Sequence, residues 1–161
     1  MVFWETFLHS IQLPRKQSVF KLNRIPMDIT VFYLFILLFL ALFPTFLHQV
    51  TENTGLGSDM NLVFQFIYFF MFNYLPVTIM LFVSITVLAY IFTWIAHLLH
   101  RKLKLQILWK MIAYTTTIPL LIYAILALFN PVSNGYLVFM IVFTSVILLR
   151  VITVYPKRKA G

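Results

Sequence analysis

Charge is scarce in this chain. Only 10% of its 161 residues are charged, whereas 62% are hydrophobic. An ordinary soluble domain has about a quarter of its residues charged and under half apolar, so the composition excludes a typical water-soluble fold. Mean hydropathy is +0.97, and 18 of the residues are phenylalanine. These figures predict an integral membrane protein that forms one membrane domain over residues 1–161.

Cysteine is absent, and acidic residues number only four. The lack of cysteine excludes disulfides, thiolate metal sites and cysteine nucleophiles. The net charge of +8 can indicate nucleic-acid binding, but the cations lie in three short clusters between long apolar runs. This arrangement favours the lipid bilayer as a partner and predicts no nucleic-acid partner. The sequence also lacks a glycine-rich loop of the kind that cradles phosphates.

A short amphipathic segment precedes the first basic cluster. Residues 2–13 place aromatic and aliphatic side chains on one helical face and mostly polar side chains on the other. The segment is too short to cross a membrane. It is therefore predicted to be a helix that lies in the membrane interface, or one that packs on the cytoplasmic face of the protein itself. Pro14 is expected to end it.

The uncharged runs locate the membrane-spanning helices. The run 29–47 reaches about 28 Å at 1.5 Å per residue, close to the hydrocarbon thickness of about 30 Å, and is the first predicted span. The run 61–99 is nearly twice as long as a span requires. Proline disfavours helix in the residue before it, so a break is predicted at residues 73–76. That break leaves a short outer helix at 62–75 and a second span at 77–99.

A third uncharged run covers residues 111–149. It is interrupted at 130–135 by the sequence Asn-Pro-Val-Ser-Asn-Gly, which has turn-forming residues at nearly every position. The run therefore predicts two further spans, 107–129 and 136–155. The predicted fold is an all-α integral membrane protein with four transmembrane helices, an N-terminal interfacial helix and a short outer helix.

Positive charge predicts the orientation of these spans. Lysine and arginine concentrate on the cytoplasmic side of membrane proteins, so all three clusters are predicted to anchor the chain at the cytoplasmic leaflet. The predicted anchors are Arg15, Lys16, Lys21, Arg24, Arg101, Lys102, Lys104, Lys110, Lys157, Arg158 and Lys159. Both termini are then cytoplasmic, and the block 61–99 crosses the membrane once. In that case the segment 62–75 is re-entrant or interfacial. The alternative, two crossings in this block, would place the middle cluster outside.

Groups that could support chemistry at depth are few. The uncharged runs contain no carboxylate and no amine, which are the groups that mark membrane enzymes and ion pathways. His97 is the one imidazole within a predicted span, and with His100 it has a spacing suited to a metal site. No third ligand stands at a related spacing. We therefore predict no catalytic, cofactor or metal site, and a membrane enzyme stays open only through His97.

The sequence Thr-Thr-Thr-Ile-Pro at 115–119 interrupts the third predicted span. Pro119 removes a backbone donor, and threonine hydroxyls or neighbouring helices can satisfy the carbonyl that it leaves free. The step is either a kink that shapes helix packing or a polar notch that admits a solute or a partner's side chain. The candidates for cavity or partner contacts are Tyr114, Thr115, Thr117, Pro119, Asn73 and Gln65.

Two stretches carry a family resemblance. The first comprises Leu13-Pro14-Arg15-Lys16, Phe20-Lys21 and Leu42-Phe43-Pro44. The second comprises Leu105-Gln106-Ile107-Leu108-Trp109-Lys110, Ala113-Tyr114 and Thr117-Ile118-Pro119. In these stretches the chain resembles the bacterial DUF1189 family, members of which are often labelled maltodextrin-utilisation proteins. The resemblance implies a bacterial plasma membrane but no catalytic residues. Family members usually carry an extended segment outside the membrane after the first span, and here that segment is short.

Two functions fit these observations. The first is a non-enzymatic accessory or scaffold subunit that binds another integral membrane protein, with a carbohydrate ABC transporter as a candidate complex. The alternative is a component of a small oligomeric transporter or channel. Neither function requires a cofactor.

Overall fold

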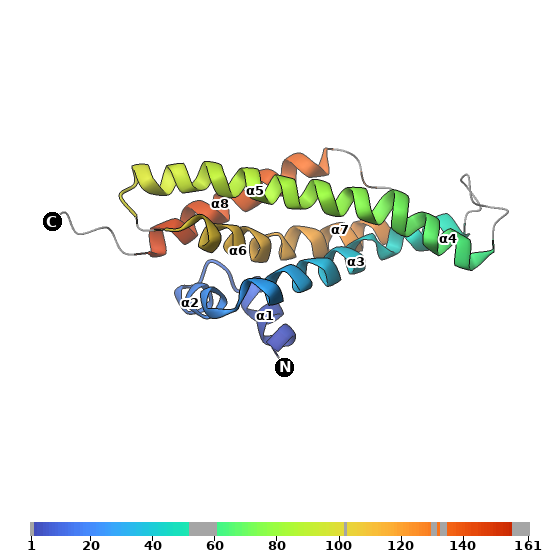
Figure 1. Cartoon of the computed structure of the whole chain (residues 1–161), viewed down its shortest axis with the longest axis horizontal. Helices are drawn as coiled ribbons and strands as arrows, with labels where there is room; N and C mark the ends of the chain where they lie inside the picture. Colours follow the sequence, from blue (N-terminus) through green and yellow to red (C-terminus); the bar gives the residue numbers. More distant parts are fainter. Residues whose placement is uncertain (1, 52–60, 102, 130–131, 133–134, 156–161) are drawn as a thin grey trace.

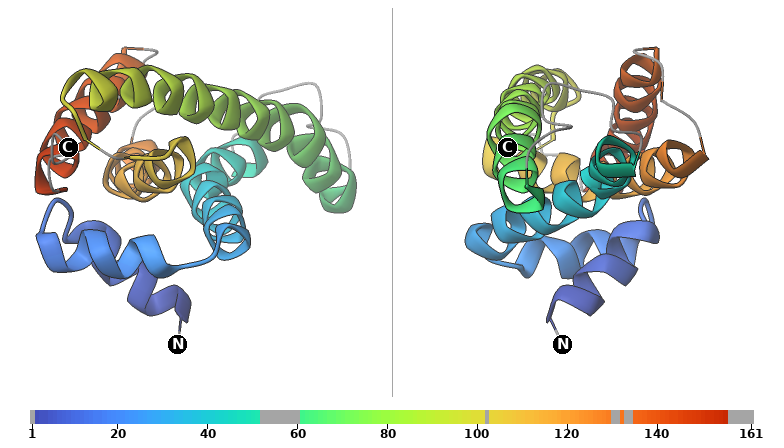
Figure 2. Two further views of the ribbon diagram at one scale, coloured as in Figure 1. Left: turned by 60° about the vertical axis from the view of Figure 1, so that its left-hand side comes forward. Right: turned by 90° about the vertical axis from the view of Figure 1, so that its right-hand side faces the viewer.

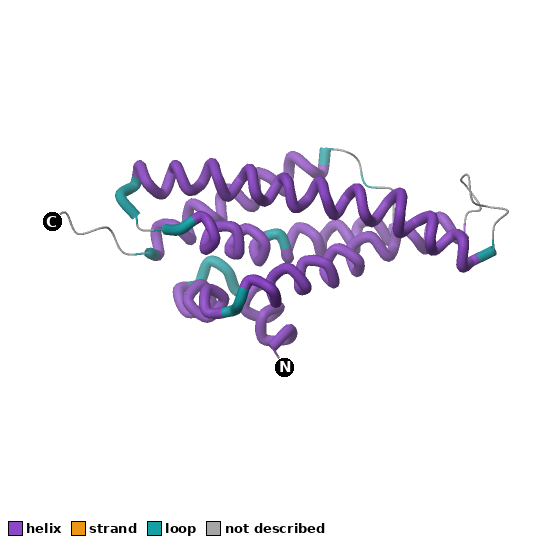
Figure 3. Tube along the Cα trace, viewed as in Figure 1, coloured by secondary structure: helices purple, strands orange, loops and turns teal. Residues whose placement is uncertain are grey.

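The computed structural model describes residues 2–51, 61–101, 103–129, 132 and 135–155, and its regular elements in these residues are all helical (Figures 1 and 3). The elements in chain order are α1 (Val2–Ile11), α2 (Lys16–Arg24), α3 (Met27–Thr51), α4 (Leu62–Phe69), the π-helical turn η1 (Phe70–Tyr74), α5 (Leu75–Leu98), α6 (Leu105–Thr115), α7 (Thr117–Phe129) and α8 (Tyr136–Val154).

Four helical stretches are long and apolar enough to cross a membrane. They are Met27–Thr51, Leu62–Leu98, Leu105–Phe129 and Tyr136–Val154. This result confirms the all-α fold with four spanning helices. Figure 2 shows α6 and α7 at the centre, with α3, α5 and α8 around them and α1 and α2 on one side. Half of the most apolar window is buried inside the protein in Leu105–Phe129 and in Met27–Thr51, against 22% in Leu62–Leu98 and in α8.

The predicted break at residues 73–76 is wrong, because the helix runs without interruption from Leu62 to Leu98. The π-helical turn η1 ends two residues before Pro76, whose missing N–H disturbs the α-helical hydrogen-bond pattern of the preceding turn. The turn also changes which side chains face α3. The buried residues Phe69 and Tyr74 are five positions apart, whereas Tyr74 and Thr78 are four apart. One extra residue in the turn therefore keeps successive buried side chains on one face, and 62–75 is not a separate outer helix.

The helix α2 lies within the first basic cluster, where the sequence analysis predicted no helix. Its buried residues are Ser18, Val19 and Leu22, which share one face. The cations of the cluster are exposed on the other face. In Figure 1, α2 lies at the same end of the bundle as the connection from α5 to α6. The first and middle basic clusters are therefore at one end of the molecule.

Candidate functional site: a polar cluster and an intramembrane cavity

The threonine step separates two helices. α6 ends at Thr115, and α7 begins at Thr117. The hydroxyl of Thr115 donates to the Met111 carbonyl at 2.7 Å, and the hydroxyl of Thr116 donates to the Ala113 carbonyl at 2.8 Å. Two of the three hydroxyls are therefore used within their own helix, as the kink interpretation expects.

Two hydroxyl pairs join this step to α3. Thr30 and Tyr114 lie 2.6 Å apart at their hydroxyl oxygens, and Tyr33 and Thr117 lie 2.9 Å apart. The two tyrosine rings contact each other with centroids 5.8 Å apart. All four side chains are buried. A buried hydroxyl without a partner is costly, so the two pairs fix the register of α3 against α6 and α7.

The helix α1 covers this region from outside and packs on α6 and α7. Thr6 and Ser10 of α1 are fully buried, and Ser10 donates to the Thr6 carbonyl at 2.7 Å. Trp4 and Leu8, by contrast, are 66% and 41% exposed. Apart from Phe7, which packs against the core, α1 thus turns its small polar residues to the protein and its large apolar residues outward.

Lys110 holds α2 against α6. Its ammonium group donates to the carbonyl of Asn23 at 2.7 Å and to that of Ile25 at 2.9 Å. These carbonyls lie at the C-terminal end of α2, where a helix has free acceptors and favours positive charge. Phe20 of α2 also contacts Tyr155, which follows α8, with ring centroids 5.6 Å apart. Burial raises the pKa of the Tyr155 hydroxyl above its usual value. The end of α8 therefore also contributes to the docking of α2.

Among the predicted cationic anchors that the structure describes, Lys110 is the exception, because it is only 7% exposed. The exposed cations are Arg15, Lys16, Lys21, Arg24 and Lys104, and Arg101 is half-buried. Lys102, Lys157, Arg158 and Lys159 lie outside the described residues. The role of Lys110 at the end of α2 was missed because α2 itself was not predicted.

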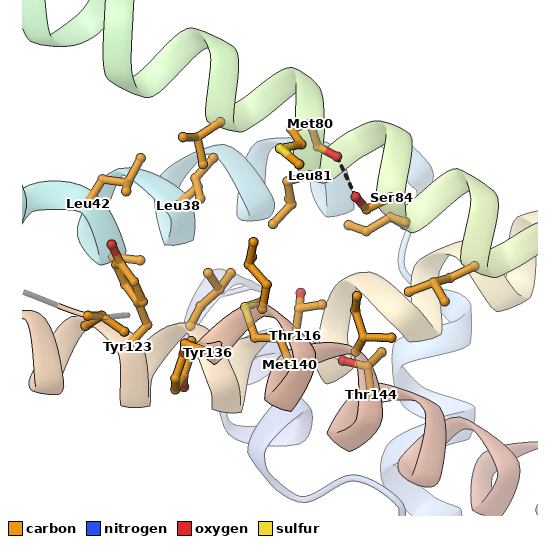
Figure 4. Close-up of a pocket in the computed structure, with 18 residues that line it drawn as sticks. Leu38, Leu42, Met80, Leu81, Ser84, Thr116, Tyr123, Tyr136, Met140 and Thr144 are labelled. Carbon is orange, nitrogen blue, oxygen red and sulfur yellow. Dashed lines mark hydrogen bonds between the residues drawn. The ribbon is translucent and has the colours of Figure 1, made fainter. Parts of the chain in front are cut away.

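A cavity of about 390 Å³ lies between α3, α5, α7 and α8 (Figure 4). Its lining has no charged residue, and most of it is aliphatic. The lining includes Leu38 of α3, Met80 and Ser84 of α5, Thr116 of the step, and Tyr136 and Thr144 of α8. The α5 side chains face those of α7 and α8 across the space in Figure 4. The volume lies within the range of small-molecule sites, about 300–1,000 Å³.

The site candidates that were predicted from the sequence do not line this cavity. Tyr114, Thr115, Thr117 and Pro119 are buried in the core, and none of them lines this cavity. Asn73 and Gln65 are half-buried on η1 and α4 and do not line it either. Of the threonine step, only Thr116 reaches the cavity. The notch and the cavity are therefore adjacent but different features.

The two histidines considered for a metal site are both exposed. One ring nitrogen of His100, Nδ1, lies 2.9 Å from the Leu98 carbonyl, and the backbone of His100 has a φ of 55°. Within the described ranges, no group of three or more His, Cys, Asp or Glu residues comes together.

A protein-family model matches more than half of the chain. The family described as protein of unknown function (DUF1189) matches residues 53–152. This range contains the second stretch that suggested the resemblance and leaves out the first. No curated protein and no solved structure matches the chain.

Proposed function

The chain belongs to the DUF1189 family of proteins of unknown function, and we propose that it is a non-enzymatic accessory subunit that binds another integral membrane protein in a bacterial plasma membrane. Both termini lie in the cytoplasm in this proposal, with the basic end of the bundle at the anionic leaflet. A carbohydrate ABC transporter is the candidate complex that the family resemblance suggests.

The observation that carries the proposal is the length of the helix from Leu62 to Leu98. Its 37 residues reach about 55 Å, whereas the hydrocarbon layer is about 30 Å thick. A tilt of about 40°, the upper end of the usual range, still leaves about 42 Å along the membrane normal. Lipid chains therefore do not cover the whole helix, and its N-terminal part, α4, extends past them.

The extending part is apolar. The α4 surface consists of Leu62, Val63, Phe64, Phe66 and Ile67, all of which are between 42% and 61% exposed. Within the chain, α4 contacts η1 and α3. Exposed apolar patches of this kind mark contact sites, and aromatic side chains are enriched in the centres of interfaces. A partner with its own membrane spans would cover the α4 surface where lipid chains end.

The transporter or channel alternative has less support. A pore shared between copies needs polar residues on an exposed face. Thr115 and Thr117 are buried and bonded within the chain, and the cavity has no charged lining.

Site-specific photocrosslinking in intact bacterial cells tests the proposal. A photoreactive phenylalanine analogue replaces Phe64 in the α4 surface, and a control replaces Val83, which is 57% exposed in the part of α5 that lipid covers. We expect one discrete integral membrane protein crosslinked at position 64 and none at position 83. The variant Phe64→Ser should lose that partner on gentle purification while it inserts into the membrane in normal amounts. Adducts with lipid alone or with a second copy of the chain, or a complex that survives Phe64→Ser, would refute the proposal.

A further inference from the structure

The cavity between α3, α5, α7 and α8 is open to the bilayer. Several of its lining residues are also exposed, among them Met80 and Ser84 on α5 and Leu137 and Ile141 on α8. In the described structure α5 packs closely on α6 and η1, and α8 packs closely on α6, α7 and α2. There is no close packing of this kind between α5 and α8. The lining residues of α3 are buried, so the opening lies between α5 and α8, and a molecule dissolved in the membrane reaches the cavity without crossing water.

The depth of the cavity corresponds to one leaflet. Its lining on α8 runs from Tyr136 to Thr144, which is the first half of a 19-residue helix. A helix of that length crosses the hydrocarbon layer about once, so its first half covers a single layer of acyl chains. Thr116 contributes to the lining from the α6–α7 kink. The cavity thus belongs to the leaflet opposite the end that carries the first and middle basic clusters.

The polar groups of the lining are mostly occupied. Ser84 donates to the Met80 carbonyl at 2.8 Å, Thr116 donates to the Ala113 carbonyl at 2.8 Å, and Tyr136 donates to the Pro119 carbonyl at 2.6 Å. A sugar, a phosphate or an ion needs several convergent polar or charged partners, which this lining does not offer. A hydrocarbon chain needs none and gains contact with the aliphatic walls.

The hydroxyls of Tyr123 and Thr144 have no hydrogen bond within the described part of the chain. In Figure 4 the Tyr123 hydroxyl points toward Leu42 of α3, at the end of the cavity away from Ser84 and Thr144. A phenolic hydroxyl there is a donor for the ester carbonyl that begins an acyl chain, while the remaining walls contact its methylenes. From these features we infer that the cavity binds one acyl chain of a membrane glycerolipid, which enters between α5 and α8. This site is independent of the proposed partner at the α4 surface.

Photoreactive lipid tests this inference. The full-length protein is reconstituted in vesicles of phosphatidylethanolamine and phosphatidylglycerol that contain a fraction of phospholipid with a diazirine in the middle of one acyl chain. After irradiation, peptide mass spectrometry measures adducts at Met140, which lines the cavity and is half-buried, and at Val146, which is 51% exposed on the same helix outside the lining. We expect adducts at both positions, because Val146 reports ordinary boundary lipid.

The variant Ser84→Phe places a ring in the cavity and should lower the adducts at Met140 about tenfold while those at Val146 stay constant. Val83→Phe is the matched control, because Val83 is the neighbouring residue on α5 and lies outside the lining. Ser84→Leu, a smaller change, should give a smaller decrease and keeps the test valid if the phenylalanine variant does not fold. Adducts at Met140 that are absent in the unmodified protein, or that persist in both Ser84 variants, would overturn the inference.

Discussion

Replacing Lys110 with methionine is expected to weaken the docking of α2 on the bundle. The Lys110 ammonium donates to two carbonyls at the end of α2, at 2.7 and 2.9 Å, and its side chain is almost fully buried. Methionine keeps the apolar stem of lysine and removes the donor and the charge. The helix α2 then retains the packing of Val19 and Leu22 but loses the ammonium donor for the free carbonyls at its C-terminal end.

The magnitude follows from the two hydrogen bonds. A hydrogen bond from a charged donor contributes about 1.5–3 kcal/mol when its partner would otherwise be unsatisfied. Exposed Arg24 lies between the two accepting residues, so water can reach this end of α2 and recover part of the loss. We therefore take about 2 kcal/mol for both bonds together. Since about 1.4 kcal/mol is a factor of ten, the fraction of molecules with α2 undocked should rise about 30-fold.

Limited trypsin digestion of the purified protein measures this fraction. Lys21 is exposed on α2, but cleavage after it requires the helix to open, so the initial rate follows the open population when opening is fast. The Lys110→Met variant should be cleaved there about 30 times faster than the unmodified protein. The control Lys104→Met removes an exposed lysine and should change the rate by no more than about twofold. If both variants behave alike, Lys110 does not hold α2 in place.

Three further measurements test other parts of the structure. A double-mutant cycle of Tyr33→Phe and Thr117→Val should give a coupling of about 0.6–1.7 kcal/mol in detergent unfolding, as expected for hydrogen bonds between membrane helices, and additive effects would contradict the pairing. Tyr74→Phe should cost about 1 kcal/mol because it loses a bond to an α3 carbonyl, whereas Tyr74→Ala should cost about 3 kcal/mol or more; equal costs would mean that the ring is not packed as η1 places it. Because the chain lacks cysteine, an impermeant maleimide should label Asn61→Cys in intact cells and Gln12→Cys only after permeabilisation, and the reverse pattern would invert the proposed orientation.

The four spans were predictable because they depend on length and polarity alone. An uncharged run near 30 Å is recognisable in any context, and all four predicted spans coincide with long apolar helices. The break before Pro76 was not predictable in the same way, because the local rule for proline allows two outcomes. The helix can end, or it can admit a π-helical turn when the extra residue improves packing. With that turn, Phe69 and Tyr74 are both buried against aromatic residues of α3, and this packing depends on residues far away in the chain.

The candidate sites depend on such distant contacts even more strongly. The partners of Tyr114 and Thr117 are 84 positions away in the sequence, and the cavity takes its walls from four helices. The local sequence marked the threonine step as unusual, but it did not show which of the three hydroxyls faces a cavity. The helix α2 did leave a signal, since Ser18 and Leu22 are spaced to share a helical face. The cations around them, Lys16, Lys21 and Arg24, favoured an interpretation as an anchor segment instead.

The orientation of α1 shows why polarity alone misleads in a chain of this kind. In water, an amphipathic helix buries its apolar face, so Thr6 and Ser10 would be expected outside. Here both are fully buried while Phe3 and Trp4 are exposed. Exposed aromatic residues cost nothing when the surroundings are acyl chains, and small hydroxyls pack closely between helices and find carbonyl partners there. The exposed aromatic residues therefore favour the interfacial position that the sequence predicts for this helix, with its aromatic face toward acyl chains.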